Sequence, residues 1–138
     1  MSIVSNLQYR KIDRGKYKYE VTRSWEYRLP DYTYGDYTHN YFCIADGVLH
    51  VYPSYQWDGA SGPTIDTKNT IAASLVHDCL YQIVEVSHLA KYNGFRKYAD
   101  KVFYDHLRAD GMSKFRAGYF YYALRIFYPV YRFIFGRR

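Results

Sequence analysis

The alternation of apolar and polar side chains over residues 17–29 limits the fold more than any other pattern in this 138-residue chain. The odd positions are mostly large and apolar, and the even positions are polar throughout: Tyr17, Tyr19, Val21, Trp25, Tyr27 and Leu29 alternate with Lys18, Glu20, Thr22, Ser24, Glu26 and Arg28. A period of two predicts a β-strand with one face in a core and the other in water. Arg23 interrupts the apolar face, and Pro30 ends the strand.

A β-hairpin is predicted shortly after this strand. Two apolar runs, residues 41–44 and 48–52, flank Ala45-Asp46-Gly47. Asp-Gly between apolar runs favours a tight turn because glycine accepts a positive φ. Residues 32–40 predict a polar, aromatic loop or a short strand. The first 56 residues therefore indicate an antiparallel sheet of three or more strands.

The second half of the chain has helical spacing. The first predicted helix begins at Thr67 or Asn69, after the N-cap candidates Asp66 and Thr67, and ends near Val86. Its apolar stripe consists of Ile71, Leu75, Cys79 and Ile83.

Two further helices are predicted. One covers residues 95–109, with Ala99, Val102, Phe103, His106 and Leu107 at helical spacing. Asp110-Gly111 ends it, with glycine as the left-handed cap. The last helix begins after Ser113 and reaches about Tyr128, where Pro129 kinks or ends it and a short basic tail can continue it.

These elements predict an α+β fold in a single domain, residues 1–138, because the length is close to that of an ordinary domain. Residues 1–56 are mainly β, residues 57–66 form a Gly-rich loop, and residues 67–138 are mainly α. We expect the N-terminal antiparallel sheet to pack against about three C-terminal helices.

The composition and the motifs of the sequence exclude several classes of protein. Two cysteines, Cys43 and Cys79, cannot make a disulfide-rich scaffold, and we expect free thiols. The N-terminus lacks the apolar core of a signal peptide. No P-loop, Rossmann fingerprint, nucleophile elbow or zinc motif is present. The net charge of +6 allows an acidic partner, and phospholipid is favoured over nucleic acid because no nucleic-acid motif accompanies the charge.

The candidate site is a Gly-rich loop followed by a helix that carries adjacent His77 and Asp78. A histidine is the natural general base near neutral pH, and it works best when a carboxylate holds its second nitrogen. Asp100 is the predicted carboxylate, with Asp105 as the alternative. Tyr81 lies one turn after His77 and can donate its hydroxyl to the same network.

Asp78 is then left to bind a hard cation. Ca²⁺ prefers carboxylate and carbonyl oxygens, and a Gly-containing loop can turn several carbonyls toward one point. The predicted metal ligands are Asp58, Gly59, Gly62 and Asp78. The alternative is structural: the loop is a turn between sheet and helix, and the histidine belongs to a buried hydrogen-bond network.

The aromatic segment 117–135 resembles a membrane span in length, but it contains Arg125, Pro129 and Arg132. An arginine in mid-bilayer costs about 3 kcal/mol, so we expect no transmembrane helix. Tyr121, Arg125, Tyr128 and Arg132 form a polar stripe. The helix either packs on the sheet or lies on a membrane or partner surface through Arg125, Tyr128 and Arg132.

The sequence resembles a family of small, uncharacterised proteins of bacteriophages and prophages. The resemblance extends over about residues 40–128 and rests on three motifs: residues 57–63 (WDGASGP), residues 72–81 with the His-Asp pair, and residues 99–103 (ADKVF). It implies a phage or prophage origin, with a virion, tail or host-interaction role.

A second, local resemblance is to the secreted phospholipases A2. In that family a His-Asp pair is followed by a Tyr three positions after the Asp, as in His77, Asp78 and Tyr81, and a second helix supplies an Asp like Asp100. The resemblance implies that His77 activates water and that Asp78 and the loop hold Ca²⁺. This chain departs from that family in having Leu80 where a cysteine is usual, and in the sheet before the loop.

The sequence therefore predicts a phage-encoded protein with a hydrolase-like site for an ester or amide bond of host envelope material. It is either phospholipase A2-like or another hydrolase that depends on His and Asp, with Ca²⁺ as the expected cofactor. The alternative is a non-enzymatic virion, tail or host-interaction protein. Expected partners are a phospholipid surface or other phage or host proteins, in the virion or the host cytoplasm.

Overall fold

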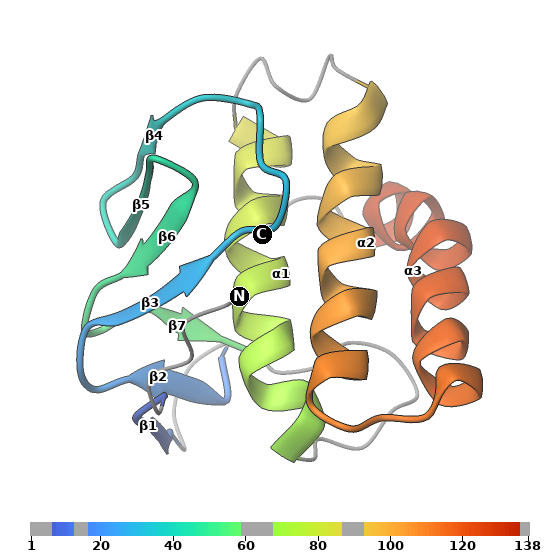
Figure 1. The fold of residues 1–138 in the computed structure, drawn as a ribbon, viewed down its shortest axis with the longest axis horizontal. Helices are drawn as coiled ribbons and strands as arrows, with labels where there is room; N and C mark the ends of the chain where they lie inside the picture. The colour runs from blue at the N-terminus through green and yellow to red at the C-terminus, as the bar shows by residue number, and fades with distance from the viewer. Residues whose placement is uncertain (1–6, 13–16, 59–67, 87–92, 136–138) are drawn as a thin grey trace. The chain divides into compact units, whose positions relative to one another are not determined.

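A computed structural model describes residues 7–12, 17–58, 68–86 and 93–135, and within the helices it describes the side chains of residues 70–84 and 94–126. The chain divides into two compact units, Met1–Asp66 and Thr67–Arg138. We call them the strand unit and the helical unit. The described strands fall in the first and the helices in the second, which confirms the α+β class (Figure 1).

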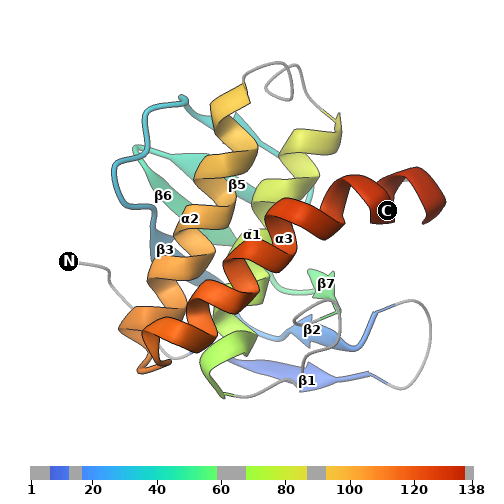
Figure 2. The same ribbon diagram turned by 90° about the vertical axis from the view of Figure 1, so that its right-hand side faces the viewer.

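The described residues of the strand unit form two antiparallel sheets. The first has the order β1-β2-β7 (Figure 2), and the second has the order β3-β6-β5-β4 (Figure 1). Their strands are β1 (Tyr9–Lys11), β2 (Tyr19–Val21), β3 (Trp25–Arg28), β4 (Tyr37–Thr38), β5 (Phe42–Ala45), β6 (Val48–Val51) and β7 (Gln56–Trp57). The prediction of one sheet is therefore corrected to two.

The alternating segment 17–29 is two strands rather than one. β2 and β3 belong to different sheets, and the break at Thr22–Ser24 contains the exposed Arg23. An arginine at a position that should face the core is costly to bury, so the chain leaves the sheet there. The alternation itself is confirmed, because Tyr19, Trp25 and Tyr27 are buried.

The hairpin prediction is confirmed. β5 and β6 pair with Ala45 opposite Val48, so Asp46 and Gly47 alone form the loop. Their φ values are 51° and 75°, the pair of positive angles that a type I′ turn requires. Trp57, which we placed in the loop, instead ends β7, where it pairs with Tyr19 and is fully buried.

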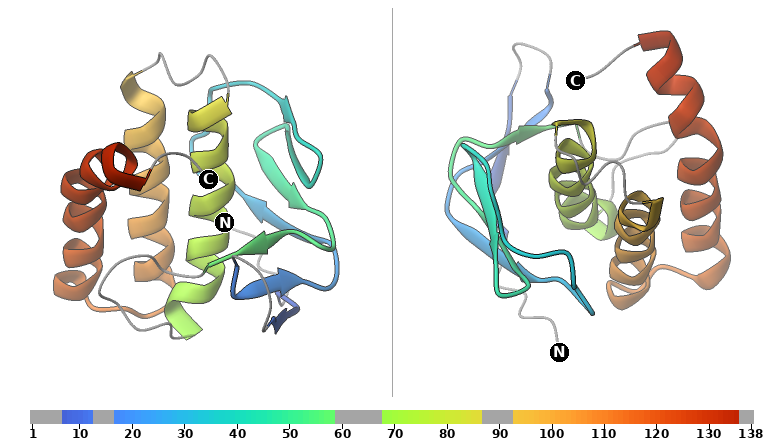
Figure 3. Two further views of the ribbon diagram at one scale, coloured as in Figure 1. Left: turned by 180° about the vertical axis from the view of Figure 1, so that it is seen from behind. Right: turned by 90° about the horizontal axis from the view of Figure 1, so that it is seen from above.

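In its described residues the helical unit contains α1 (Lys68–Val86), α2 (Asn93–Ala109) and α3 (Lys114–Phe135). α2 lies between α1 and α3, as the views from behind and above show (Figure 3). The predicted stripes form the core: Ile71, Leu75, Cys79 and Ile83 of α1, and Ala99, Val102, Phe103, His106 and Leu107 of α2, are all buried. Both cysteines are free thiols, as expected.

The ends of α2 and α3 follow the capping signals. Gly111 has a φ of 100°, and the amides of Gly111 and Met112 donate to the carbonyls of Arg108 and Leu107, which is the Schellman pattern. Ser113 caps α3, because its hydroxyl accepts a hydrogen bond from the Arg116 amide. Of the outcomes expected at Pro129, continuation is observed, since α3 reaches Phe135.

Candidate functional site

The candidate site lies inside the helical unit, around the carboxylate of Asp100. This side chain projects from α2 and is 0% exposed. An isolated buried carboxylate is strongly unfavourable, so its partners decide whether it can remain charged. Its hydrogen-bond and ion-pair partners among the described residues are side chains of all three helices: His77 and Tyr81 of α1, Arg96 of α2 and Arg125 of α3.

One carboxylate oxygen binds two side chains of α1. His77 Nε2 lies 2.9 Å from Asp100 Oδ1, and the Tyr81 hydroxyl donates to the same oxygen at 2.5 Å. His77 and Tyr81 are four residues apart on α1, which places them on one face of the helix. The structure thus brings together the three residues predicted as catalytic.

The other carboxylate oxygen faces two arginines. Arg125 Nη1 of α3 donates to Asp100 Oδ2 at 2.9 Å, and Arg96 Nη1, one turn earlier on α2, lies 3.7 Å from it. The arrangement links α1, α2 and α3 through one carboxylate. Arg125 is 29% exposed and Arg96 is 23% exposed, so both arginine side chains retain some contact with solvent while Asp100 has none.

These contacts fix the charge state of the network. Burial raises the pKa of Asp100, but the hydrogen bonds from His77, Tyr81 and Arg125 outweigh burial and hold the pKa below its usual value of 3.8. Burial, and then the adjacent Asp100 charge, raise the pKa of Tyr81 well above 10.0. Near neutral pH, Asp100 is therefore an anion and Tyr81 a neutral donor.

An ionised Asp100 also sets the tautomer of His77. A carboxylate can only accept hydrogen bonds, so Nε2 must carry the proton that His77 donates to Asp100. In neutral His77, Nδ1 is then the nitrogen that bears a lone pair. Among the described residues, Nδ1 has no hydrogen-bond partner, and 12% of the side chain is exposed.

Aromatic rings restrain the imidazole further. The centroid of the His77 ring lies 4.0 Å from that of Tyr81 and 5.1 Å from that of Phe103, a buried residue of α2. The contacts of the imidazole with the rings of Tyr81 and Phe103, together with its hydrogen bond to Asp100, limit the rotation of the His77 side chain. A general base requires this kind of restraint, since proton transfer depends on a fixed geometry.

The predicted metal ligands are placed only in part. Asp78 lies on α1 beside His77 and is half-buried, and Asp58 is the last described residue of the strand unit before the loop. Gly59 and Gly62 lie outside the described residues. Within the described parts of the chain, no group of three or more His, Cys, Asp or Glu side chains is arranged to hold a metal ion. The Ca²⁺ site stays a prediction.

The residues predicted for a membrane or partner surface are also placed in part. Arg125 is directed to Asp100, whereas the side chains of Tyr128 and Arg132 lie outside the described set. Asp105, the alternative to Asp100, forms an exposed ion pair with Lys101. Sequence reasoning missed the ion pairs of Arg96 and Arg125; for Arg96 the signal was its i, i+4 spacing from Asp100.

Comparison with known proteins gives one result. No curated protein and no solved structure shows a significant match. A family profile described as a protein of unknown function, DUF1353, matches residues 31–124. The matched range contains His77, Tyr81, Arg96 and Asp100 and ends one residue before Arg125. Because the match covers more than half of the chain, this protein belongs to the DUF1353 family of proteins of unknown function.

Proposed function

We propose that the helical unit carries a hydrolytic site in which His77 is the general base and Asp100 holds it in place. The observation that carries the proposal is the pair of bonds at Asp100 Oδ1, from His77 Nε2 at 2.9 Å and from the Tyr81 hydroxyl at 2.5 Å. They orient the ring and fix its tautomer, as a base in a His-carboxylate pair requires.

The reaction is hydrolysis of a carboxylic ester or amide. Nδ1 of His77 accepts a proton from a water molecule as the water oxygen bonds to the carbonyl carbon. The tetrahedral intermediate collapses, the bond from carbon to the leaving oxygen or nitrogen breaks, and the imidazolium returns its proton to the leaving group. The ionised Asp100 stabilises the imidazolium in between, and Tyr81 stays protonated and holds Asp100.

The substrate class rests on the resemblance of His77, Asp78, Tyr81 and Asp100 to the phospholipase A2 pattern, which favours a phospholipid ester. A phage origin and an envelope of the host as the target are further parts of the proposal. A Ca²⁺ ion at Asp58, Gly59, Gly62 and Asp78 would polarise the carbonyl of the substrate. No step above passes through that ion.

The second candidate function is non-enzymatic, with the network as a structural link in a virion or host-interaction protein. The observation that favours it is the pairing of Asp100 Oδ2 with Arg125 at 2.9 Å, since it links α2 to α3 and its loss would leave the buried carboxylate without a partner on α3. The two functions predict different effects of removing the imidazole of His77. The hydrolase loses activity, whereas the structural link loses stability.

His77→Gln separates the two. A glutamine amide can still donate to Asp100, but it cannot accept a proton at neutral pH. We expect hydrolysis of phospholipid micelles and short-chain esters, with and without millimolar Ca²⁺, to fall by at least about 100-fold while the thermal unfolding midpoint stays close to wild type. His50→Gln, at a partly exposed histidine of β6, is the control.

Two results would decide against the hydrolase. One is equal hydrolysis by wild type and His77→Gln, which would place the activity elsewhere. The other is an absence of hydrolysis in wild type together with a large loss of stability in His77→Gln, which is the outcome expected of the structural alternative.

A further inference from the structure

The outward face of α3 exposes a row of large apolar side chains. Phe115, Tyr119, Tyr122 and Ile126 follow the spacing i, i+4, i+7, i+11, and all are classed as exposed. Phe115 is 90% exposed, Tyr122 65% and Ile126 62%. The opposite face of the same helix is buried at Ala117 and Phe120. α3 is therefore apolar on two faces, one of which is open to solvent, as is typical of an interaction surface.

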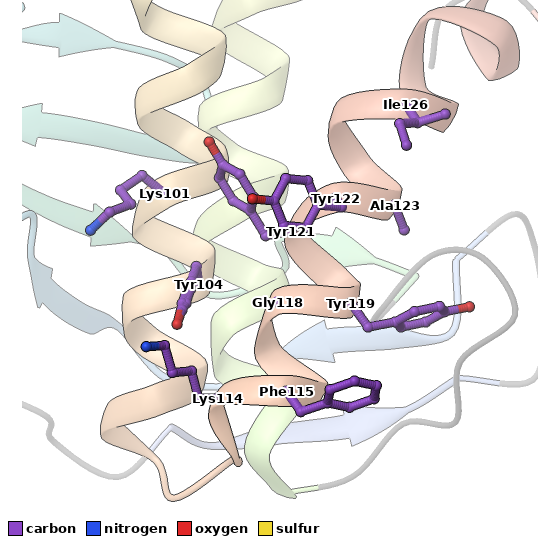
Figure 4. Close-up of a pocket in the computed structure, with 10 residues that line it drawn as sticks. All are labelled: Lys101, Tyr104, Lys114, Phe115, Gly118, Tyr119, Tyr121, Tyr122, Ala123 and Ile126. Atoms are coloured by element: carbon purple, nitrogen blue, oxygen red, sulfur yellow. The ribbon is translucent and has the colours of Figure 1, made fainter.

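The row borders a shallow groove of about 770 Å³ between α2 and α3. Lys101 and Tyr104 of α2 line one side, and residues of α3 from Lys114 to Ile126 line the other (Figure 4). Phe115 and Tyr119 project from α3 in the same direction (Figure 4). No residue of the His77–Asp100 network lines this groove, so the inference stands apart from the proposed hydrolysis.

The net charge of the protein is concentrated in the same segment. Residues 111–138 contain six Lys or Arg and no Asp or Glu, while the other 13 basic and 13 acidic residues, all within residues 1–110, cancel. The whole formal charge of +6 thus belongs to α3 and the ends that flank it. Lys114 and Arg116 are exposed, and among the described residues neither forms a salt bridge.

We propose that this face of α3 binds the surface of an anionic phospholipid bilayer. An amphipathic helix with aromatic and aliphatic residues along one line, flanked by basic residues, lies in the headgroup region with its apolar side inserted. Basic residues near an anionic surface add to the affinity. The row spans 12 residues, about 16 Å of helix from Phe115 to Ile126, which suits a helix lying in the plane of the membrane.

Charge and length favour this occupant over others. A second copy of the chain on this face would bring the exposed Lys114 and Arg116 of each copy together, which is repulsive. No described helix is long and apolar enough to cross a bilayer. The surface differs from the one predicted from the sequence, because Arg125 faces Asp100 and the open row consists of Phe115, Tyr119, Tyr122 and Ile126.

The test is co-sedimentation of the full chain with vesicles. One set contains equal parts of phosphatidylcholine and phosphatidylglycerol, and the other contains phosphatidylcholine alone. We expect binding to the anionic set that weakens with salt, and little binding to the neutral set. Phe115→Ser with Ile126→Ser should weaken binding at least about tenfold, because both side chains are exposed and contribute by insertion.

Two control variants separate the surface from general charge. Lys114→Glu and Arg28→Glu change the net charge equally, but Arg28 is an exposed residue of β3 in the strand unit. We expect Lys114→Glu to weaken binding about tenfold and Arg28→Glu to weaken it much less. Tyr41→Ser removes an exposed aromatic residue outside α3 and should leave binding unchanged. Circular dichroism checks that each variant is folded.

Four results would overturn the proposal. The first is no binding of wild type to anionic vesicles. The second is equal binding to these vesicles by wild type and by the Phe115→Ser, Ile126→Ser variant. The third is an equal loss of vesicle binding in Lys114→Glu and in Arg28→Glu. The fourth is a dimer or an oligonucleotide complex that the α3 variant loses while vesicles are not bound. That result would assign the face to a second copy or to nucleic acid.

Discussion

Replacement of Arg125 by methionine tests how the buried carboxylate is held. The variant keeps the length and much of the apolar stem of the side chain but removes the charge that donates to Asp100 Oδ2 at 2.9 Å. Loss of one partner from a buried ion pair costs about 3–5 kcal/mol. Arg96 remains 3.7 Å from the same oxygen and Arg125 is 29% exposed, so we expect a smaller loss. We expect about 2 kcal/mol at pH 7.

The pH dependence of this loss follows from the lowered pKa of Asp100. A carboxyl group with a lowered pKa in the folded protein stabilises the fold above its unfolded pKa, here 3.8. That contribution disappears as pH falls through the lower folded value. Arg125→Met raises the folded pKa of Asp100 toward 3.8, so the difference in stability from wild type should be full near pH 7 and shrink below 3.8.

Urea unfolding followed by circular dichroism at a series of pH values measures this difference. Arg116→Met is the matched control, since Arg116 is an exposed arginine on the same helix without a salt bridge among the described residues. The reasoning is refuted if Arg125→Met and Arg116→Met lose similar stability at pH 7, or if the loss for Arg125→Met is the same at pH 7 and pH 3.

Three further changes test the helical unit. Tyr81→Phe should lower the free energy of unfolding by about 1–2 kcal/mol, measured by calorimetry. Above pH 10 the stability of this variant should fall less steeply than that of wild type, because the raised pKa of Tyr81 contributes stability that is lost once pH rises above the unfolded value of 10.0. Gly111→Ala should lower the free energy of unfolding in urea by about 1–2 kcal/mol, because φ at this position is 100°. An unfolding midpoint equal to that of wild type would refute the role of Gly111 as the helix cap. Burial lowers the pKa of His106 from 6.5 to about 4, although Asp110 lies 3.4 Å away. The free energy of unfolding of wild type should therefore fall by about 3 kcal/mol between pH 7 and pH 4, and that of His106→Gln should not show this loss. Parallel curves of unfolding free energy against pH for the two proteins would contradict this.

Local patterns were sufficient to predict the elements that depend on neighbouring residues. The turn at Asp46-Gly47 and the cap at Gly111 were readable because a positive φ is carried by the residue itself. His77 and Tyr81 could be placed on one face from the helical period alone. Their meeting with Asp100 required the further argument that a histidine base needs a carboxylate on a neighbouring helix.

Other features that depend on distant residues were not predicted. Arg125 was read as part of an outward polar stripe, but spacing on one helix does not say which side another helix covers, and the exposed row proved to start at Phe115. Likewise, the alternation over residues 17–29 predicted one strand, but not its division into β2, which pairs with β7, and β3, which pairs with β6. Pairing between strands distant in sequence is decided by the whole sheet.

The tautomer of His77 tests the central claim most directly, because it needs no substrate. Long-range ¹H–¹⁵N NMR spectra of labelled protein near neutral pH distinguish a protonated from an unprotonated ring nitrogen. In the neutral ring we expect the proton on Nε2, which bonds Asp100, and an unprotonated Nδ1. In Asp100→Asn, whose side chain is neutral, this preference should weaken. A proton on Nδ1 in the wild type, or a tautomer that does not respond to Asp100→Asn, would contradict the account of His77 as a base held by Asp100.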